Sequence, residues 1–356
     1  GWLRIFGKCL SFGGKASVRL IGPDGRERTV KPSRQECWSL TVGIPENAAS
    51  GEYRGAVRNG YTGQAAWREA GAIRIAPHAP VWKADVFDAA KFGAVASDGM
   101  DDTAALQAAL DAAGTNGGGT VFIPCGRFQM NDPIRIPRFV LLKGAGRELS
   151  QLYWRDTPEP FESLIYAGNS FGIEDLTIMA ANHRYGVLAD SSDKPDAGNA
   201  TLRRLHIHLN RFEQLWTDES IRRFPDTAWE HAIDLGGENI QVTDCEIFCS
   251  KSPFRISGDD VVVRDNRFFE GGSAHVIGGQ RIIFEDNVIE GGPVGRGGGD
   301  YGSRMYYARN TVGMTPLSDG EGFTTDGGGN APVTLVSCEG TRLEIGNDID
   351  WGRWTR

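Results

Sequence analysis

Three acidic side chains lie close together near the end of this 356-residue chain. Asp319, Glu321 and Asp326 fall within one short segment whose flanking residues are small enough to let a sugar approach. Hydrolysis of a glycosidic bond requires two carboxyl groups that flank the bond, about 5–5.5 Å apart for retention and about 6.5–9.5 Å apart for inversion. The segment 318–329 therefore predicts a carboxylate acid/base pair, with a Gly/Asp turn as the alternative interpretation.

Other polar and aromatic side chains could bind a sugar around these acids. An insertion at about residues 210–230 carries two tryptophans, and long loops on a rigid scaffold commonly hold binding residues. Asp234 lies 21 residues before Arg255, and a surface ion pair between them is the alternative to a role in binding. The substrate-binding residues that we predict are Trp216, Trp229, Tyr301, Arg304, Tyr306, Asp300 and Asp234.

The spacing of histidines and cysteines predicts no metal site. His206 and His208 share one strand face, but a third ligand is not evident, and none of the six cysteines belongs to a C-x-x-C pair. Cys9 and Cys37 could form a disulfide in the first domain. The cysteines that we expect to be buried free thiols are Cys125, Cys245, Cys249 and Cys338.

A sequence repeat supplies the rigid scaffold that the candidate side chains require. Phrases of the form Asp/Arg-x-x-Ile/Phe/Val recur at intervals of 29, 40, 21, 21 and 23 residues. A fixed period of this size indicates a solenoid, and one near 21–23 residues corresponds to one β-helix coil. Asn266, Asn287 and Asn310 occupy the same position of the repeat, so we expect their amides to stack as a ladder. The polar pair at 259–260 should form a turn.

The same register predicts which side chains fill the core. Val261 and Val263 in one coil, and Ile282 and Phe284 in the next, alternate with residues that should face outward. Glu270 and Glu290 each end a strand before Gly-Gly, which favours a stacked turn over an active acid pair.

Residues 87–130 predict a capped helix followed by a buried strand. Asp101 or Asp102 can accept N–H bonds at the start of a helix over about 101–113, whose apolar stripe consists of small residues. Three consecutive glycines then lead into a buried strand at 120–124.

This stretch resembles the N-terminal cap and first coil of the pectate-lyase-like superfamily, of pectate lyase superfamily 3 type, which includes polygalacturonases and phage tailspikes. The pattern that carries the resemblance is F-G-A-x-x-D-G-x-D-D-T-x-A-hydrophobic-Q, followed by G-G-G-T-V-x-hydrophobic-P-x-G. The resemblance implies a right-handed parallel β-helix with a substrate groove along one sheet, and structural roles for Asp101, Asp102 and Thr103. The Asn-Thr-Asp, Gly-His-Gly and Arg-Ile-Lys motifs of polygalacturonases are absent, which removes that specific assignment.

We expect an all-β chain with two domains. Short alternating strands and turn residues over 1–76 predict a small immunoglobulin-like β-sandwich, either structural or weakly sugar-binding, and two prolines make 77–84 a stiff linker. The parallel β-helix should cover 85–356. Because residues 351–356 offer no capping element, we expect the natural polypeptide to continue or another chain to cover that end. Gly1 in place of Met indicates a processed or trimmed chain.

Charge divides the two domains and excludes some partners. Residues 1–76 carry a net charge of about +6, and the remainder carries about −14. An acidic main domain disfavours nucleic acid as a partner and argues weakly against a strongly polyanionic substrate. The sequence contains no apolar run of the roughly 18 residues that a membrane span needs, and no signal peptide.

Together these observations predict a carbohydrate-active β-helix enzyme, most simply a secreted or periplasmic glycoside hydrolase that needs no cofactor. One alternative is a polysaccharide lyase, which would want calcium on clustered acids and an Arg or Lys base. Arg304 near Asp300 is the pair that suggests it. The other alternative is a non-catalytic, tailspike-like protein that binds glycans.

Overall fold

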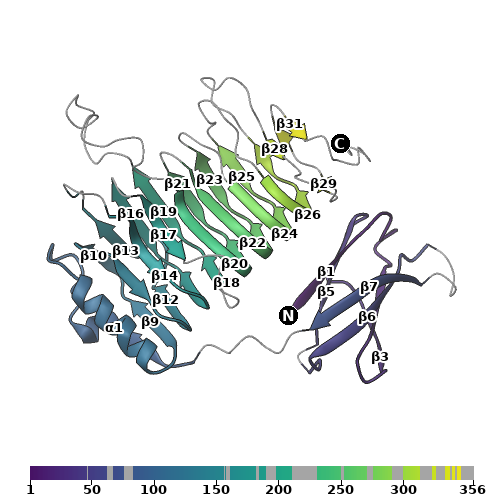
Figure 1. Cartoon of the computed structure of the whole chain (residues 1–356), viewed down its shortest axis with the longest axis horizontal. Coiled ribbons are helices and arrows are strands. Elements are labelled where there is room, and N and C mark those ends of the chain that lie inside the picture. The colour runs from purple at the N-terminus through teal and green to yellow at the C-terminus, as the bar shows by residue number, and fades with distance from the viewer. Residues whose placement is uncertain are drawn as a thin grey trace. The chain divides into compact units, whose positions relative to one another are not determined.

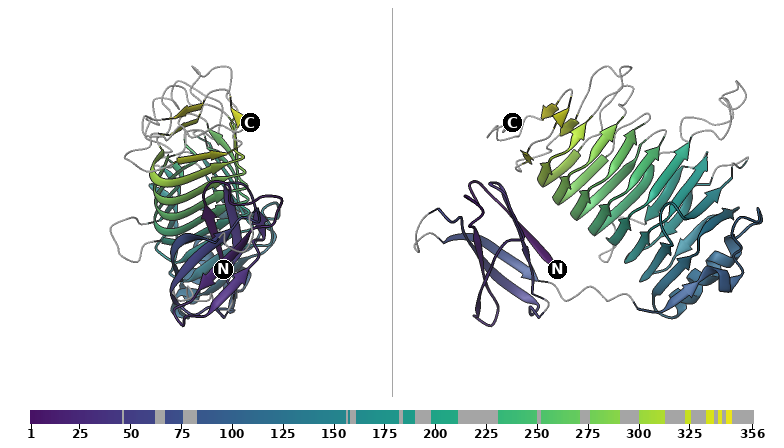
Figure 2. Two further views of the ribbon diagram at one scale, coloured as in Figure 1. Left: turned by 90° about the vertical axis from the view of Figure 1, so that its right-hand side faces the viewer. Right: turned by 180° about the vertical axis from the view of Figure 1, so that it is seen from behind.

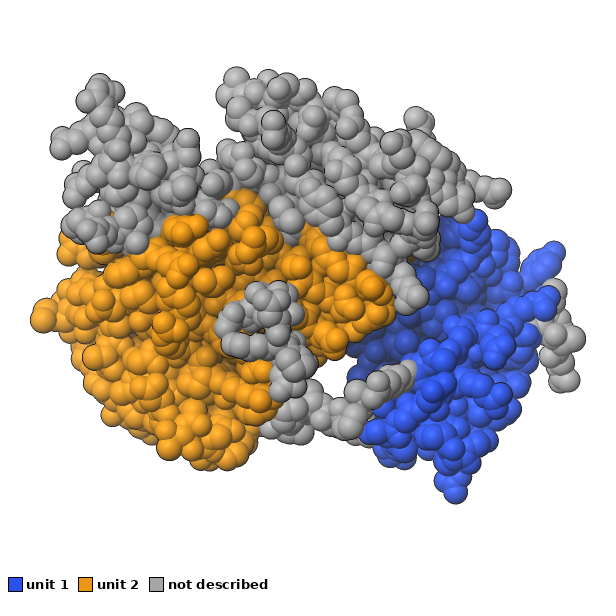
Figure 3. Space-filling view, in the orientation of Figure 1, with its two compact units in different colours: residues 1–81 blue, residues 82–356 orange. Residues whose placement is uncertain are grey.

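The chain folds into two compact units, Gly1–Val81 and Trp82–Arg356, coloured separately in Figure 3. The computed structural model describes residues 1–45, 47–61, 67–75, 83–155, 157, 161–181, 184–189, 198–210, 231–249, 252–270, 276–290, 300–312, 323–325, 333–336, 339–340 and 343–345. Within these residues, no helix is both long and apolar enough to cross a membrane.

The first unit consists of two small antiparallel sheets that share one core. The sheets have the strand orders β1-β5-β4 and β3-β2-β6-β7. The strands are β1 (Trp2–Phe6), β2 (Ser17–Ile21), β3 (Glu27–Val30), β4 (Arg34–Gln35), β5 (Ser39–Gly43), β6 (Gly51–Arg58) and β7 (Arg68–Ile75). Val18 and Leu20 from one sheet are buried against Leu40 and Val42 from the other. The small β unit is confirmed, whereas an immunoglobulin-like strand arrangement stays a prediction.

The second unit is a solenoid of parallel strands arranged on three faces (Figures 1 and 2). The first face contains β8 (Val86–Asp88), β9 (Gly119–Ile123), β12 (Val140–Gly144), β15 (Phe171–Glu174), β18 (Gly198–Arg203) and β29 (Val333–Val336). The second contains β10 (Gly126–Met130), β13 (Ser150–Trp154), β16 (Thr177–Ala181), β19 (His206–Asn210), β21 (Glu246–Cys249), β23 (Arg267–Glu270), β25 (Val288–Glu290), β27 (Thr311–Val312) and β30 (Glu339–Gly340). The third begins with β11 (Ile134–Ile136), β14 (Ser163–Ala167) and β17 (Tyr185–Ala189).

Four long strands bend around a corner and supply both the third and the first face. They are β20 (His231–Thr243), β22 (Phe254–Arg264), β24 (Val276–Glu285) and β26 (Asp300–Ala308). In β20, for example, Asp234 pairs with the third-face strand β17, and Val242 pairs with the first-face strand β18. Beyond them, β28 (Phe323–Thr325) pairs with β31 (Leu343–Ile345). The predicted parallel β-helix is therefore confirmed.

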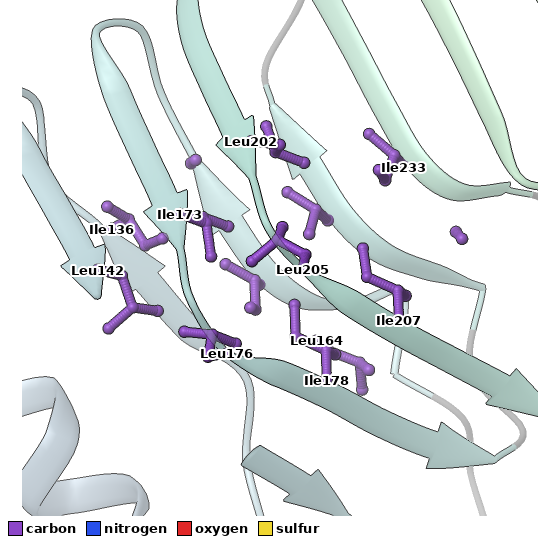
Figure 4. Packing of buried hydrophobic residues seen from close by; sticks show 14 of the residues in the cluster. Ile136, Leu142, Leu164, Ile173, Leu176, Ile178, Leu202, Leu205, Ile207 and Ile233 are labelled. Atoms are coloured by element: carbon purple, nitrogen blue, oxygen red, sulfur yellow. The ribbon is translucent and has the colours of Figure 1, made fainter. Parts of the chain in front are cut away.

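Apolar rows run through the interior of the coils. Leu142, Ile173 and Leu202 are successive neighbours in register, each 0% exposed, and Figure 4 shows them inside the solenoid. The alternation predicted for the later coils is also confirmed, because these four side chains are 0% exposed: Val261, Val263, Ile282 and Phe284. Burial of these apolar side chains is the main favourable contribution to the free energy of folding.

A short helical region covers the N-terminal end of the solenoid. It contains η1 (Ala89–Phe92) and α1 (Thr103–Thr115). The Asp101 carboxylate accepts the Thr103 N–H at 3.0 Å, at the start of the helix. Asp102 instead accepts N–H bonds from Val95 at 2.8 Å and from Gln129 at 3.1 Å, so it joins the cap to β10. The structural role predicted for both acids is confirmed.

The corner between the first and second faces contains the predicted amide ladder. Asn266 Nδ2 donates to Asn287 Oδ1 at 3.0 Å, and Asn287 Nδ2 donates to Asn310 Oδ1 at 3.0 Å. Each amide also bonds a backbone group, as when Asn287 Nδ2 donates to the Val263 carbonyl. All three side chains are buried, so these bonds satisfy polar groups that water cannot reach.

The corner between the third and first faces is a stack of polar turns. Glu238 and Asp259 are paired in register, and Asn239, Asp260 and Arg281 all have left-handed backbone, with φ between 56° and 59°. Arg281 bonds Asp260 of the preceding coil through Nε at 2.6 Å and Nη2 at 2.9 Å. The interpretation of residues 259–260 as a turn is confirmed.

Two details of the sequence interpretation were wrong. Cys125 is exposed and not buried, and Cys9 and Cys37 are free and exposed; Cys245 and Cys249 are buried as predicted, and Cys338 lies outside the described residues. Glu270 and Glu290 are not neighbours either. Glu290 pairs with Phe269, and its carboxylate instead accepts a 2.8 Å bond from Arg267.

Candidate functional site

The third face carries a row of outward side chains on successive strands. Its described members are neighbours in register: Arg135, Tyr166, Leu188, Asp234 and Arg255. Successive residues of a strand point to opposite faces, and the residues on either side of this row, such as Ile165 and Ile233, are 0% exposed core. Four charged or phenolic side chains therefore lie on one outer surface, in two pairs whose members are one coil apart.

Asp234 and Arg255 form a two-point ion pair across adjacent coils. Arg255 Nε donates to Asp234 Oδ1 at 3.1 Å, and Nη2 donates to Oδ2 at 2.6 Å. The Asp234 side chain is only 7% exposed, whereas the Arg255 side chain is 49% exposed. A buried carboxylate needs such a partner, and the paired geometry fixes the plane of the guanidinium. The predicted ion pair is confirmed, and substrate contact by Asp234 stays a prediction.

The other end of the row holds a second polar cluster. The Arg135 guanidinium lies 4.5 Å from the centre of the Tyr166 ring, and the Tyr166 hydroxyl donates to Glu162 at 3.3 Å. Burial raises the pKa of the Tyr166 hydroxyl, and the charge of Glu162 raises it further. Tyr166 therefore stays protonated at neutral pH, and its hydroxyl proton is the one that Glu162 accepts.

Beside the ion pair, the next outward row is made of small residues. Gly236, Ser257 and Gly278 are neighbours in register. Small side chains leave the strand backbones close to the surface, so a ligand can lie flat against this part of the face. We regard the two rows together as the candidate binding surface.

The structure separates several residues that the sequence interpretation placed together. Asp300 pairs with Ile277 and so is in register with a buried row, whereas Tyr301 pairs with Gly278 of the small-residue row. Tyr306 belongs to the first face, where its side chain is 2% exposed and packs with Ile283. Arg304 lies between Ser303 and Met305, which pair with Gln280 and Ile282, so it takes the corner position that Arg281 has one coil earlier.

The predicted catalytic acids and tryptophans lie outside the described residues: Asp319, Glu321, Asp326, Trp216 and Trp229. Their roles therefore stay predictions. The strand β28 separates Glu321 from Asp326 along the chain.

The histidines of β19 face outward on the second face. Their ring centres are 6.5 Å apart, and His208 packs 4.7 Å from Phe248. His206 has Glu246 as its neighbour in register. Among the described residues, no group of three or more His, Cys, Asp or Glu side chains is arranged to hold a metal ion.

Sequence reasoning missed the cluster of Arg135 and Tyr166. A signal was present, because both residues alternate with apolar neighbours in short strands. These strands precede the regular 21–23-residue repeat, so the sequence did not show that they align with Asp234.

The cap and the first coils of the second unit are similar to a known protein family. Residues 86–172 match the family model described as "Rhamnogalacturonase A/epimerase, pectate lyase-like". This match covers η1, α1 and the strands from β8 into β15. The second unit is a pectate lyase-like parallel β-helix.

Short segments are also similar to two curated proteins of Azotobacter vinelandii. Mannuronan C5-epimerase AlgE3 is 32% identical over 111 residues, which are 28% of this chain and 6% of that protein. Mannuronan C5-epimerase AlgE1 is 43% identical over 51 residues, which are 14% of this chain and 4% of that protein. The matches thus span a small part of each relative.

Two solved structures are similar at low sequence identity. The A-module of mannuronan C-5 epimerase AlgE4 from Azotobacter vinelandii has a TM-score of 0.41 and 15% identity, covering 74% of this chain and 99% of that one. A family 28 exopolygalacturonase from Yersinia enterocolitica has a TM-score of 0.41 and 10% identity, covering 99% and 95%.

Proposed function

We propose that the second unit is a carbohydrate-active enzyme that binds a polysaccharide along its third face and acts on uronic acid residues in it. One observation carries the proposal: a half-exposed Arg255 guanidinium, fixed by the buried Asp234, stands beside the small-residue row of the face. A planar guanidinium binds carboxylates in a defined geometry, which suits the acidic group of a uronic acid.

The comparisons support the same class of substrate. The names of both curated relatives include mannuronan, which is a polymer of uronic acid. The acidic charge of residues 77–356 disfavours a dense polyanion in general, so local cations should govern which sugar binds. Arg135 and Arg255, at either end of the described outward row, are the cations in position to do so.

The first candidate reaction is hydrolysis of the glycosidic bond. Asp319, Glu321 and Asp326 would supply the general acid and its carboxylate partner. Neighbouring coils of a β-helix lie about 4.8 Å apart, so acids one or two coils apart meet the separations that retention or inversion requires. Arg255 would bind the sugar carboxylate next to the bond that breaks.

The second candidate is acid–base chemistry at C5 of a uronic acid, which the names of the curated relatives favour. A base removes the C5 proton, and a cation on the carboxylate stabilises the charge that develops. Return of a proton on the opposite face gives epimerisation, whereas loss of the C4 oxygen gives elimination. Calcium bound to clustered acids would be needed only for elimination in this proposal.

Product analysis separates these reactions. The protein is incubated with polygalacturonate, polymannuronate and a neutral glucan, in the presence of calcium or a chelator. New reducing ends without ultraviolet absorbance select hydrolysis, and absorbance of an unsaturated product selects elimination. In a parallel reaction run in heavy water, deuterium incorporation at C5 without chain shortening selects epimerisation. Turnover of the neutral glucan alone would contradict the uronic acid proposal.

A matched pair of variants tests the site. Arg255→Lys keeps the charge but loses the two-point geometry, so we expect turnover on a uronate polymer to fall about 100-fold. Arg281→Lys is the control, because Arg281 bonds Asp260 across one coil in the same two-point manner but lies in a turn. Equal effects of the two substitutions would show that Arg255 is structural. We also propose that the protein works outside the cytoplasm, where such polymers occur, which cell fractionation would test.

A further inference from the structure

The outer face of the sheet β1-β5-β4 in the first unit carries exposed aromatic and cationic side chains. In β1, Leu3 and Ile5 face the core of the unit, so the alternate residues Trp2, Arg4 and Phe6 face outward. Trp2 is 40% exposed and Phe6 is 44% exposed. Two large aromatic side chains are therefore exposed on the same face of one strand, with a cation between them.

The cations of this face lie between the two aromatic rings. Arg4 is opposite Thr41, and Thr41 is opposite Arg34, so the three form a row across the sheet. Arg4 Nε donates to the Thr41 hydroxyl at 3.1 Å, and the guanidinium lies 5.6 Å from the Trp2 ring. Arg34 Nε donates to Glu36 at 3.0 Å. Both arginines are thus oriented before any ligand arrives.

The distance between the Trp2 and Phe6 side chains fits an extended ligand and not a compact one. Trp2 and Phe6 are four residues apart on a strand, which separates them by about 13 Å at roughly 3.3 Å per residue. That distance spans several sugar units of an extended chain. The row of Arg4, Thr41 and Arg34 crosses the sheet midway between them.

The opposite sheet of the unit provides a contrast. Trp67 has the Arg19 guanidinium 4.3 Å and the Arg58 guanidinium 5.4 Å from its ring centre. Two guanidiniums therefore lie against that ring, the nearer at 4.3 Å, whereas the Arg4 guanidinium is 5.6 Å from the Trp2 ring. Arg19 is also paired with Glu27 at 3.6 Å. An external sugar has a more accessible aromatic surface at Trp2 and Phe6.

We propose that this face of the first unit is a binding site for a polysaccharide chain that carries carboxylates. The aromatic rings of Trp2 and Phe6 stack on sugar rings, and Arg4 and Arg34 bind the acidic groups between them. Charge complementarity supports an anionic ligand, because residues 1–76 contain 12 Lys and Arg against 6 Asp and Glu. This site is separate from the third face of the second unit, and it requires no reaction there.

Binding of the full chain to polygalacturonate tests the proposal, by affinity electrophoresis with a neutral glucan in parallel. We expect retardation by polygalacturonate that decreases with salt, and weaker retardation by the glucan. The double variants Trp2→Ala/Phe6→Ala and Arg4→Gln/Arg34→Gln should each raise Kd at least roughly tenfold. Loss of salt dependence should accompany only the arginine variant. Thermal unfolding should be unchanged, because the substituted side chains are not in the core.

Controls come from the same unit. Tyr61→Ala removes an aromatic side chain of a residue that is 76% exposed, and Arg26→Gln removes a cation whose side chain is 80% exposed. Both should bind as the parent does. Equal weakening by the controls, or parental binding by both double variants, overturns the inference. The Arg255→Lys variant separates the two proposals: if it abolishes binding and the first-unit variants do not, the polymer binds the second unit instead.

Discussion

The corner between the first and second faces is held together differently in the early and late coils. In the early coils its interior position is leucine, at Leu176 and Leu205, and both side chains are 0% exposed. In the late coils the same position is asparagine, and the amides bond each other and the backbone of the adjacent coil. One backbone geometry thus accepts an apolar and a polar solution, and each works only when the neighbouring coils share it.

Cys245 lies between the leucines of the early coils and the asparagine ladder of the late coils. Its backbone N–H donates to Asn266 Oδ1 at 2.9 Å, so the first amide of the ladder has a partner. Its own side chain is a buried thiol, and burial raises the pKa of that thiol to about 12. A neutral thiol behaves as a small apolar group with weak hydrogen-bonding capacity. It can therefore face leucine on one side and asparagine on the other.

The largest loss of stability should come from placing a leucine within the asparagine ladder. Asn287→Leu leaves the backbone N–H and side-chain amide of Asn266 and the carbonyl of Val263 without the partner that they now have. We expect a loss of about 3–4 kcal/mol in the free energy of unfolding, because buried polar groups become unsatisfied. Urea unfolding of the full chain, followed by a probe in the second unit, measures it.

The reciprocal change and a combined variant sharpen this prediction. Leu205→Asn should also destabilise, because its amide would be buried between leucine and cysteine positions. Replacing Asn266, Asn287 and Asn310 together by leucine should cost less than the sum of the three single changes, since no amide is left to lose a partner. Additive losses would show that the ladder is not cooperative. Thr311→Ala, at an exposed position of β27, is the control.

The ladder could be predicted from sequence because it is tied to a fixed period. Counting residues from each ladder asparagine also predicts which residues of neighbouring coils pair in register. Counting back ten residues from Asn266, Asn287 and Asn310 reaches Ile256, Ile277 and Asp300, which are neighbours in register. The error for Glu270 and Glu290 has the same origin: the first is four residues after its ladder asparagine, and the second is three. Alignment on Gly-Gly hid that difference.

The candidate site was less predictable for two physical reasons. The third-face strands β11 and β14 precede the regular repeat, so the alignment of Arg135 and Tyr166 with Asp234 depends on backbone pairing that the sequence does not display. Conversely, segments such as 210–230 and 313–322 do not repeat at all, and no period fixes where their side chains lie. A column of polar residues is informative only when its register is known.

A smaller effect is expected outside the ladder, in the left-handed residues of the same corner. Asp175 accepts bonds from Arg204 Nε and from Nη2 at 2.7 Å, and Arg204 holds the pKa of this carboxyl below its usual range. Asp175→Asn keeps a side chain that tolerates the φ of 59° but removes the charge. We expect a loss of about 1 kcal/mol at neutral pH. Because the folded-state pKa is lowered, the difference should shrink as pH falls below the usual Asp range, about 3.9.

The smallest effect should have the opposite sign, at the equivalent residue of a late coil. Asp265 has the same left-handed backbone, with φ of 58°, but burial raises the pKa of its carboxyl, and Asp286, Glu285 and Asp244 raise it further. Arg264 lies 3.7 Å away and lowers it only in part. A raised folded-state pKa means that the ionised form costs stability once pH rises through that value. Asp265→Asn should therefore stabilise the fold by a few tenths of a kcal/mol at neutral pH, an effect kept small by the 59% exposure of the side chain.

The gain in stability from Asp265→Asn should vanish in acid, where the parent carboxyl is protonated. Unfolding midpoints of both Asn variants from pH 3 to pH 7 test the pair, and a loss at Asp265 that equals the loss at Asp175 would show that the backbone turn, and not the charge around it, sets stability at this corner.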